Sequence, residues 1–322
     1  MSLLIYAESA DGKLKKVAFE LASYAKKVAE SLGTTVTAVT VNPGDVSELS
    51  KYGVDKVLKV TNDKLATFNA KAYADVIKQA AQKEGAKVIV LSSTTDSIYL
   101  APFVAVGLEA GFASNVVGLP LSTSPFQVKR NAFSNKAFNI TEISTDVKVL
   151  GLAKNSYGLV ESNSSLSTED FSPNLNDADF NVKVENVEKV TGKVTIADAE
   201  VVVSGGRGLK GPENWALVED LATVLGAATA CSKPVSDLGW RPHSEHVGQT
   251  GKPVATNLYI AIGISGAIQH IAGINSSKVK VVINSDPEAP FFKVADYGVV
   301  GDAFEIVPKL TQKLKEFKAQ NS

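Results

Sequence analysis

From residue 3 to residue 93 the sequence alternates short apolar runs with longer segments of helical period. The apolar runs occupy residues 3–8, 35–41, 55–60 and 87–93. The first segment of helical period has apolar residues at Val17, Leu21, Tyr24, Val28 and Leu32 and ends at Gly33. A second such segment covers roughly residues 66–84. Strands that alternate with amphipathic helices form right-handed βαβ units around a parallel sheet. This pattern predicts the α/β class.

The pattern of apolar runs changes over residues 115–155. Four strand-like runs, at 115–121, 127–133, 136–143 and 147–153, follow one another without helices between them. We expect them to pair locally, in antiparallel fashion, at one edge of the first sheet. Residues 155–180 are rich in Ser, Asn and Asp and are predicted to be a connecting loop.

A second α/β unit is predicted after residue 190. Residues 182–200 show strand-like alternation, and VVVSGGRG (201–208), LYIAIGIS (258–265) and KVKVVINSD (278–286) are buried strands that end in small or polar residues. PENWALVEDLATVLG is the helix behind the first of them, and AIQHIAG opens a helix after the second. With 322 residues, we predict two domains, 1–190 and 191–322, each with a mainly parallel sheet flanked by helices. The carboxyl ends of parallel strands meet at one edge, where ligands bind in open α/β sheets.

Composition excludes several classes of function. The formal net charge is −1, so no basic field points to nucleic acid or to an anionic membrane. The single cysteine, Cys231, rules out an intrachain disulfide or a metal site built from several thiolates. His243 and His246 lack a third metal ligand at a suitable spacing, so no metal is expected. The apolar stretches are too short to span a bilayer. We expect a cytoplasmic bacterial protein without direct membrane insertion.

Three glycine-rich segments are candidate ligand sites. GRGLKG (206–211) fits the G-x-G-x-x-G pattern between a strand and a helix, but the expected acidic residue is missing, so a structural turn is as good an interpretation. VGQTGKPV (247–254) is not an ATPase loop, because His246 and Pro253 stand where Gly and Ser or Thr are needed. It remains a loop that offers backbone amides with Gln249 and Thr250, and by itself a plain loop is the simpler interpretation.

In GISGAIQHIAG (263–273) a strand passes into a helix at Ser265 and Gly266, where free amides attract phosphate. His270 follows one helical turn later and is either a ligand contact or a buried histidine bonded to a backbone carbonyl. No nucleophile elbow or catalytic acid–base pair can be singled out.

Taken in order, six motifs resemble the alpha subunits of electron transfer flavoproteins. They are GRG (206–208), CSKPVSDLGW (231–240), VGQTGK (247–252), LYIAIGISGAIQHIAG (258–273), INSDPEAPFF (283–292) and ADYGVVGD (295–302). The resemblance implies a Rossmann-like FAD-binding domain at 191–322 and a nucleotide alpha-hydrolase-like domain at 1–190 that contacts a beta subunit. It further implies one non-covalent FAD, AMP in the beta subunit, and no substrate turnover by this chain.

The resemblance also implies a route for electrons. They would pass from flavoprotein dehydrogenases, such as the acyl-CoA dehydrogenases of fatty acid beta-oxidation, to a membrane quinone oxidoreductase or another acceptor. One alternative is a bifurcating electron transfer flavoprotein that oxidises NADH at a second FAD in the beta subunit. Another is a stand-alone nicotinamide-dependent oxidoreductase, for which the chain shows no acid–base pair.

By the same resemblance, the FAD contacts fall into five groups. Arg207 lies in the Gly-rich turn. Val247, Gly248, Gln249 and Thr250 form a loop at the flavin, with Thr250 near N5 and Gln249 at the ribityl chain. The segment Ser265, Gly266, Ala267, Ile268, Gln269 and His270 holds the diphosphate and places the histidine near O2. Asn284, Asp302 and Ala303 lie toward the adenosine, and Ser232 with Lys233 matches a Ser-Arg pair of the family.

Lys233 stands where the family commonly has arginine. Lysine keeps the positive charge but has no planar guanidinium to stack on a ring. A cation near the flavin N1–O2 edge favours the one-electron anionic semiquinone, and we expect Lys233 to keep the sign of this effect while weakening or repositioning it. We therefore expect Lys233→Ala to lower the reduction potential for the first electron, measured by redox titration. Potentials identical to those of the wild type would contradict this role.

Overall fold

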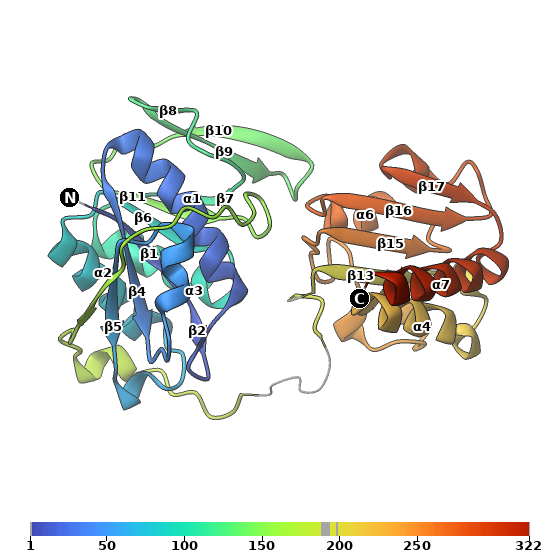
Figure 1. The fold of residues 1–322 in the computed structure, drawn as a ribbon, viewed down its shortest axis with the longest axis horizontal. Coiled ribbons are helices and arrows are strands. Elements are labelled where there is room, and N and C mark those ends of the chain that lie inside the picture. Colours follow the sequence, from blue (N-terminus) through green and yellow to red (C-terminus); the bar gives the residue numbers. More distant parts are fainter. Residues whose placement is uncertain (1, 188–193, 198, 322) are drawn as a thin grey trace. The chain divides into compact units, whose positions relative to one another are not determined.

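The structure is a computed structural model that describes residues 2–187, 194–197 and 199–321. The chain divides into two compact units (Figure 1). The first unit extends to Val187 except for residues 134–136, which group with the second. The predicted domain boundary near residue 190 lies outside the described residues. Within the described ranges, no helix has the length and apolar character needed to cross a membrane.

The first unit is built on a ten-stranded sheet. Its strand order is β10-β9-β7-β11-β6-β1-β4-β5-β12, with β8 paired to β9 alone. From β7 to β12 all neighbours are parallel, whereas β8, β9 and β10 pair in antiparallel fashion. The strands are β1 (Ser2–Tyr6), β4 (Thr35–Val41), β5 (Lys56–Val60), β6 (Val88–Ser92), β7 (Gly111–Val116), β8 (Ser122–Thr123), β9 (Phe126–Ala132), β10 (Ala137–Glu142), β11 (Lys148–Leu152) and β12 (Ser167–Asp170). A small separate hairpin joins β2 (Ser9–Ala10) to β3 (Lys13–Leu14).

Helices cover both faces of this parallel sheet. Helix α1 (Lys16–Leu32) packs with Leu3 and Ile5 in one apolar cluster, and it ends at Gly33 in a left-handed conformation, as the sequence predicts. Helices α2 (Ala70–Glu84) and α3 (Thr95–Gly107) pack with Leu4 in the cluster on the other face. The α2 helix begins at Ala70 because the Asn69 side chain accepts hydrogen bonds from two backbone amides of its first turn.

Helix α3 has no counterpart in the sequence prediction. It is apolar on all sides, so its sequence lacks the period that reveals an amphipathic helix, and it contains Pro102. Leu100 and Val104 are buried against the sheet, whereas Tyr99 and Phe103 are more than half exposed.

Strand β11 corrects the prediction for residues 147–153. The hairpin β9–β10 is antiparallel at the sheet edge as expected, but β11 lies between β6 and β7 and is parallel to both. Val149 and Leu150 are fully buried on opposite faces of the sheet. A strand buried on both faces has a continuous apolar sequence, and VKVLGLA has this property whereas the neighbouring edge strands do not.

The predicted loop over residues 155–180 also contains a strand. Residues Ser167–Asp170 form β12, which is parallel to β5 at the opposite edge of the sheet. Its side chains are mostly exposed, so backbone pairing holds it in place and no apolar pattern marks it. The predicted alternation over 182–200 is not a strand where the structure describes it, and residues 188–193 and 198 lie outside the described residues.

The second unit contains a five-stranded sheet in the order β14-β13-β15-β16-β17, and all its neighbours are parallel. Numbered along the chain from β13, this is the doubly wound order 2-1-3-4-5, so the parallel arrangement expected of the three strands that end in small or polar residues is confirmed. The strands are β13 (Val201–Gly205), β14 (Ala228–Cys231), β15 (Leu258–Ile262), β16 (Val279–Asn284) and β17 (Tyr297–Val300).

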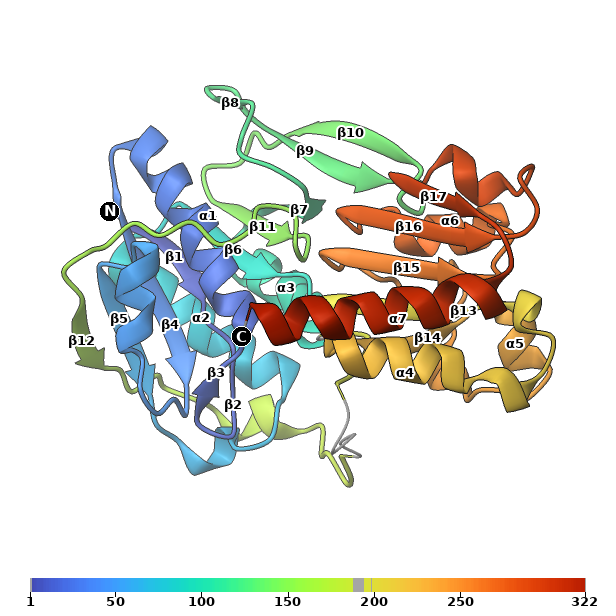
Figure 2. The same ribbon diagram turned by 45° about the vertical axis from the view of Figure 1, so that its right-hand side comes forward.

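Helices again lie on both faces of the second sheet. Figure 2 shows α4 (Ala216–Leu225) and α7 (Ala303–Gln320) side by side on one face, where they share an apolar cluster with Val203 and Ile260. Helix α6 (Ile268–Ile274) lies on the other face with Tyr259 and Phe291, and the short helix α5 (Lys233–Asp237) follows β14. The α/β class predicted for both halves of the chain is confirmed.

The central position of β11 predicts the effect of core truncations. Because Leu150 is fully buried, Leu150→Ala should lower the free energy of unfolding of the first unit by about 2–5 kcal/mol. Val149→Ala, on the other face, should cost ~2 kcal/mol. Ile140→Ala on the edge strand β10 should change it by less than about 0.5 kcal/mol. Urea denaturation measures all three, and a Val149→Ala variant as stable as Ile140→Ala would contradict burial on both faces.

Candidate functional site

The candidate site residues gather at the carboxyl edge of the second sheet. Because the five strands are parallel, the segments that follow them emerge on the same side. Arg207 follows β13, Ser232 and Lys233 follow β14, Ser265 follows β15, Asn284 ends β16 and Asp302 follows β17. The structure therefore brings together residues that are up to a hundred positions apart in the chain.

Two glycine turns meet at the point where the strand order reverses, between β13 and β15. The Gly206 amide donates to the Ile262 carbonyl at 2.8 Å, and the Gly208 amide donates to the Gly263 carbonyl at 3.1 Å. A Cβ atom on Gly206 would lie 2.2 Å from the Gly263 oxygen. Gly263 has a φ of +62°. Only glycine permits this backbone contact between the turns that follow β13 and β15.

Two cations, Arg207 and Lys233, stand at this edge. Arg207 and Lys233 are exposed, and no hydrogen bond or ion pair engages either side chain within the described part of the chain. Arg241, by contrast, is held by Glu245 at 2.7 Å and by Glu219 at 3.1 Å. The free guanidinium of Arg207 beside the glycine turn is therefore available to an anionic ligand.

The loop 247–252 packs against α6. The backbone amide of Gln249 donates to the backbone carbonyl of Gln269 at 2.8 Å. The backbone amide of Gly251 donates to the Gly248 carbonyl at 3.1 Å and closes a turn. A Cβ atom on Gly273 would lie 2.6 Å from the Gly248 Cα. The backbone is thus fixed while the side chains of Gln249 and Thr250 are exposed at the tip.

The segment after β15 is held by the segments after β16. The Ser265 carbonyl accepts from the Phe291 amide at 3.0 Å, and the Ile264 carbonyl accepts from the Asn284 side chain at 3.0 Å. Gly266 has a φ of +86°, and a Cβ atom there would lie 2.6 Å from the Phe291 nitrogen. At the next strand, the Asp302 side chain caps α7 by accepting from the Phe304 amide at 2.9 Å. Asn284 therefore holds the Ser265–Gly266 turn in place, and it lies itself at the carboxyl edge of the sheet.

His270 is buried beneath the site. Its Nε2 lies 2.8 Å from the hydroxyl of Tyr259, whereas its buried Nδ1 has no hydrogen-bond partner among the described residues. Burial, helped by the nearby His246, lowers the pKa of His270 to about 4, so the ring is neutral near pH 7. The structure confirms the burial of His270, with the Tyr259 hydroxyl at its Nε2. Its role as a ligand contact stays a prediction.

Sequence reasoning missed Tyr259, and it considered His246 as a metal ligand only to reject that role. Tyr259 is fully buried in β15. A buried tyrosine hydroxyl needs a hydrogen-bond partner, and this requirement is the clue in the sequence to its pairing with His270. His246 is also buried, with its Nδ1 unpartnered among the described residues. In the same ranges, His, Cys, Asp and Glu form no group of three placed to bind a metal ion.

Comparison with known proteins adds two family matches. The family model described as "Electron transfer flavoprotein domain" matches residues 3–179, and the one described as "Electron transfer flavoprotein FAD-binding domain" matches residues 195–275. The second match includes the candidate residues from Arg207 to His270, and Asn284, Asp302 and Ala303 lie beyond it.

Three curated relatives are similar over nearly their whole length, and each is described as "Electron transfer flavoprotein subunit alpha". The relative from Bacillus subtilis is 35% identical over 317 residues, which cover 98% of this chain and 97% of the relative. The relative from Thermoanaerobacterium thermosaccharolyticum is 35% identical over 325 residues, which cover 98% of each. The relative from Syntrophomonas wolfei is 38% identical over 319 residues, which cover 97% and 98%.

The burial of His270 predicts a pH dependence of stability. Its pKa of about 4 in the folded chain lies below its ordinary value, so as pH falls the unfolded chain takes up the proton first. The contribution of the neutral, buried His270 to the free energy of unfolding is complete above about pH 6.5 and is lost as pH falls toward 4. The wild type should therefore lose ~3 kcal/mol of unfolding free energy relative to His270→Gln over this range.

Urea denaturation of the second unit at several pH values measures this difference. The exposed His243 offers a matched control, because His243→Gln should keep the wild-type profile. Parallel profiles for the wild type and His270→Gln would contradict the assignment.

Proposed function

Because the chain belongs to the family of electron transfer flavoprotein alpha subunits, we propose that it holds one non-covalent FAD at the carboxyl edge of its second sheet and carries electrons between other proteins. The observation that carries this proposal is the backbone contact of Gly206 and Gly208 with Gly263. It brings together the turns that follow β13 and β15 where the strand order reverses, which is the position at which open α/β sheets bind ligands.

The residues at this edge fit a flavin dinucleotide. The glycine turns let a diphosphate approach the backbone, and the unpaired Arg207 supplies a guanidinium suited to phosphate oxygens. The buried Nδ1 of His270 lacks a partner among the described residues, and a ligand carbonyl would supply one. Arg207 belongs to the glycine turn after β13 and His270 to α6, and these features suit one class of ligand.

Each part of the edge would have its own task. Arg207 with the Ser265–Ile268 segment would bind the diphosphate, and Asn284 with Asp302 and Ala303 would lie toward the adenosine. Gln249 and Thr250, presented by a fixed turn, would orient the ribityl chain and the ring. When bound, the flavin supplies one-electron redox chemistry.

His270, Lys233 and Ser232 would act on the ring electrostatically. A neutral His270 held by Tyr259 offers a hydrogen bond without a permanent charge, whereas the exposed Lys233 offers a positive charge. The buried Ser232 is fixed by its amide, which donates to the Gly205 carbonyl at 3.1 Å. No group in this set needs to move a substrate proton, which agrees with an electron carrier.

The partner proposed for the first unit is an electron transfer flavoprotein beta subunit. Tyr99, Phe103 and Val106 are spaced by four and three residues on one face of α3, and each is more than half exposed. Large apolar side chains gathered on an exposed helix face mark protein interaction sites. The beta subunit would carry AMP, and the heterodimer would accept electrons from flavoprotein dehydrogenases and pass them to an acceptor oxidoreductase.

Copurification with the beta subunit tests the proposed function. The complex should be yellow, should show a flavin spectrum, and should release FAD and AMP in equal amounts on denaturation. Release of a second FAD in place of AMP would indicate the bifurcating form instead. A colourless complex that stays free of adenine nucleotide after reconstitution with FAD would contradict the proposal.

The α3 face has a matched test in the same experiment. Tyr99→Lys with Phe103→Lys should greatly reduce recovery of the beta subunit, because it places charges on the apolar face. Phe138→Lys, which changes an equally exposed aromatic residue on β10, is the control and should keep the complex. Equal recovery with both variants would place the interface elsewhere.

A further inference from the structure

The first sheet has a reversal of strand order of its own, between β1 and β6. From β1 the chain passes through α1 to β4 on one side, and from β6 it passes through α3 toward β7 on the other side. Helices α1 and α3 lie on opposite faces of the sheet. This is the position at which open α/β sheets bind ligands, and it is the counterpart of the glycine-lined crevice in the second sheet.

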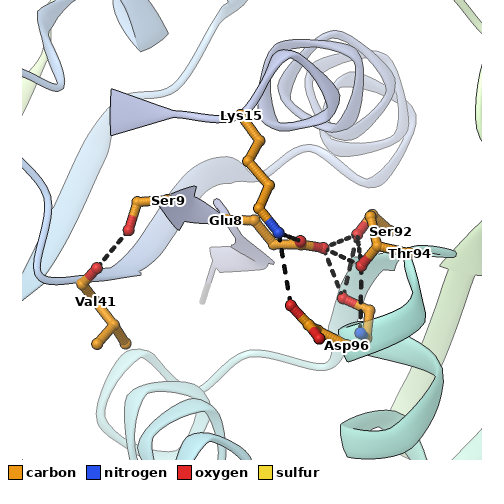
Figure 3. Close-up of polar contacts among 8 residues, drawn as sticks. Glu8, Ser9, Lys15, Val41, Ser92, Thr94 and Asp96 are labelled. Atoms are coloured by element: carbon orange, nitrogen blue, oxygen red, sulfur yellow. Dashed lines mark hydrogen bonds and ion pairs between the residues drawn. The ribbon is translucent and has the colours of Figure 1, made fainter. Parts of the chain in front are cut away.

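In the first sheet this position is filled by Glu8 (Figure 3). Its side chain is 2% exposed and lies just beyond the end of β1. Oε1 accepts hydrogen bonds from the hydroxyls of Thr94 at 2.6 Å and Ser97 at 2.9 Å, and also from the hydroxyl of Ser92. Oε2 accepts from the ammonium of Lys15 at 2.9 Å. The carboxylate therefore joins the segment after β1 to the segment after β6.

The groups around Glu8 have the chemistry of an oxyanion receptor. Three hydroxyl donors converge on a single oxygen and an ammonium lies on the other, which is the environment that a phosphate oxygen also prefers. Thr94 is in addition the cap of α3, because its hydroxyl oxygen accepts from the Ser97 amide at 3.2 Å.

The cluster holds its carboxylate in the charged form. Burial alone would raise the pKa of Glu8, but Lys15 and the hydroxyls of Ser92 and Thr94 outweigh it and keep the pKa below its ordinary value. Asp96, whose Oδ2 lies 3.6 Å from the Lys15 nitrogen, helps to keep the ammonium over the site. The donors are therefore arranged for a permanent anion.

We propose that Glu8 is a built-in anion that occupies a phosphate-binding position at the reversal point of the first sheet. It closes this crevice to phosphate-bearing ligands, so that the second sheet alone remains open to a dinucleotide. Removal of the carboxylate leaves an oxyanion site formed by Ser92, Thr94, Ser97 and Lys15.

Phosphate binding by full-length Glu8→Ala tests this proposal. Equilibrium dialysis against inorganic phosphate, at an ionic strength held constant with chloride, is run beside the wild type, so that any site on the second sheet is counted in both. Glu8→Ala should bind one more phosphate per chain than the wild type. Equal binding by the two proteins would overturn the proposal, whatever the outcome of the flavin experiments.

Two further variants separate a receptor from a nonspecific cavity. Glu8→Gln keeps the volume of the side chain and should gain no phosphate. Thr94→Val added to Glu8→Ala removes one of the converging donors and should abolish the gain. Phosphate binding that persists in the double variant would mean that the donors do not form the site.

Should Glu8→Ala be insoluble, refolding replaces dialysis as the measurement. Its yield of folded protein should rise in phosphate relative to chloride at equal ionic strength, and the yield of wild type should not. A Glu8→Ala yield that does not respond to phosphate would overturn the proposal.

Discussion

The contact between the Gly206–Gly208 turn and Gly263 determines most of what the second unit offers. The loops that follow β13 and β15 are in backbone contact. A residue with a side chain would not fit at these positions. The remaining edge is built outward from this contact. Asn284 and Phe291 hold the turn after β15, and α6 in turn carries the loop 247–252. The exposed side chains of this edge are therefore mounted on a backbone that has little freedom to shift, which is what a preorganised cofactor site requires.

The two sheets show how similar architecture leads to different chemistry. Each has a point where strand order reverses, and the general rule for open α/β sheets makes both candidates for a ligand. In the first, a buried carboxylate consumes the donors that a ligand would use. In the second, the amides of Gly206 and Gly208 bond to β15 and the turn after it, and the Arg207 side chain has no partner in the described part of the chain. Fold class alone thus identifies two positions, and the identity of one or two side chains separates them.

The sequence predicted the parts of the fold that carry an apolar period, and failed where packing hides that period. Helix α1 was predictable because one of its faces is polar, whereas α3 is apolar all round and escaped. Strand β12 is polar and is held by its backbone alone, so no side-chain pattern reveals it. The position of β11 depends on long-range pairing, which local alternation does not encode. For the site, parallel strands ending in small residues predicted the edge, but the pairing of His270 with Tyr259 and of Glu8 with the hydroxyls at the start of α3 depends on how strands and helices pack.

The burial of His270 bears on how such an edge could tune a flavin. A charged imidazolium would impose its full charge on every redox state, whereas a neutral ring with a low pKa responds by hydrogen bonding and costs little to keep in place. Tyr259 fixes one ring nitrogen at 2.8 Å, so the orientation of the other is set from within the core. The exposed Lys233 supplies the opposite kind of influence, a full charge screened by solvent. If the flavin lies where we propose, the buried dipole of His270 and the screened charge of Lys233 would together give the moderate stabilisation of the reduced form that a carrier needs to accept and release electrons.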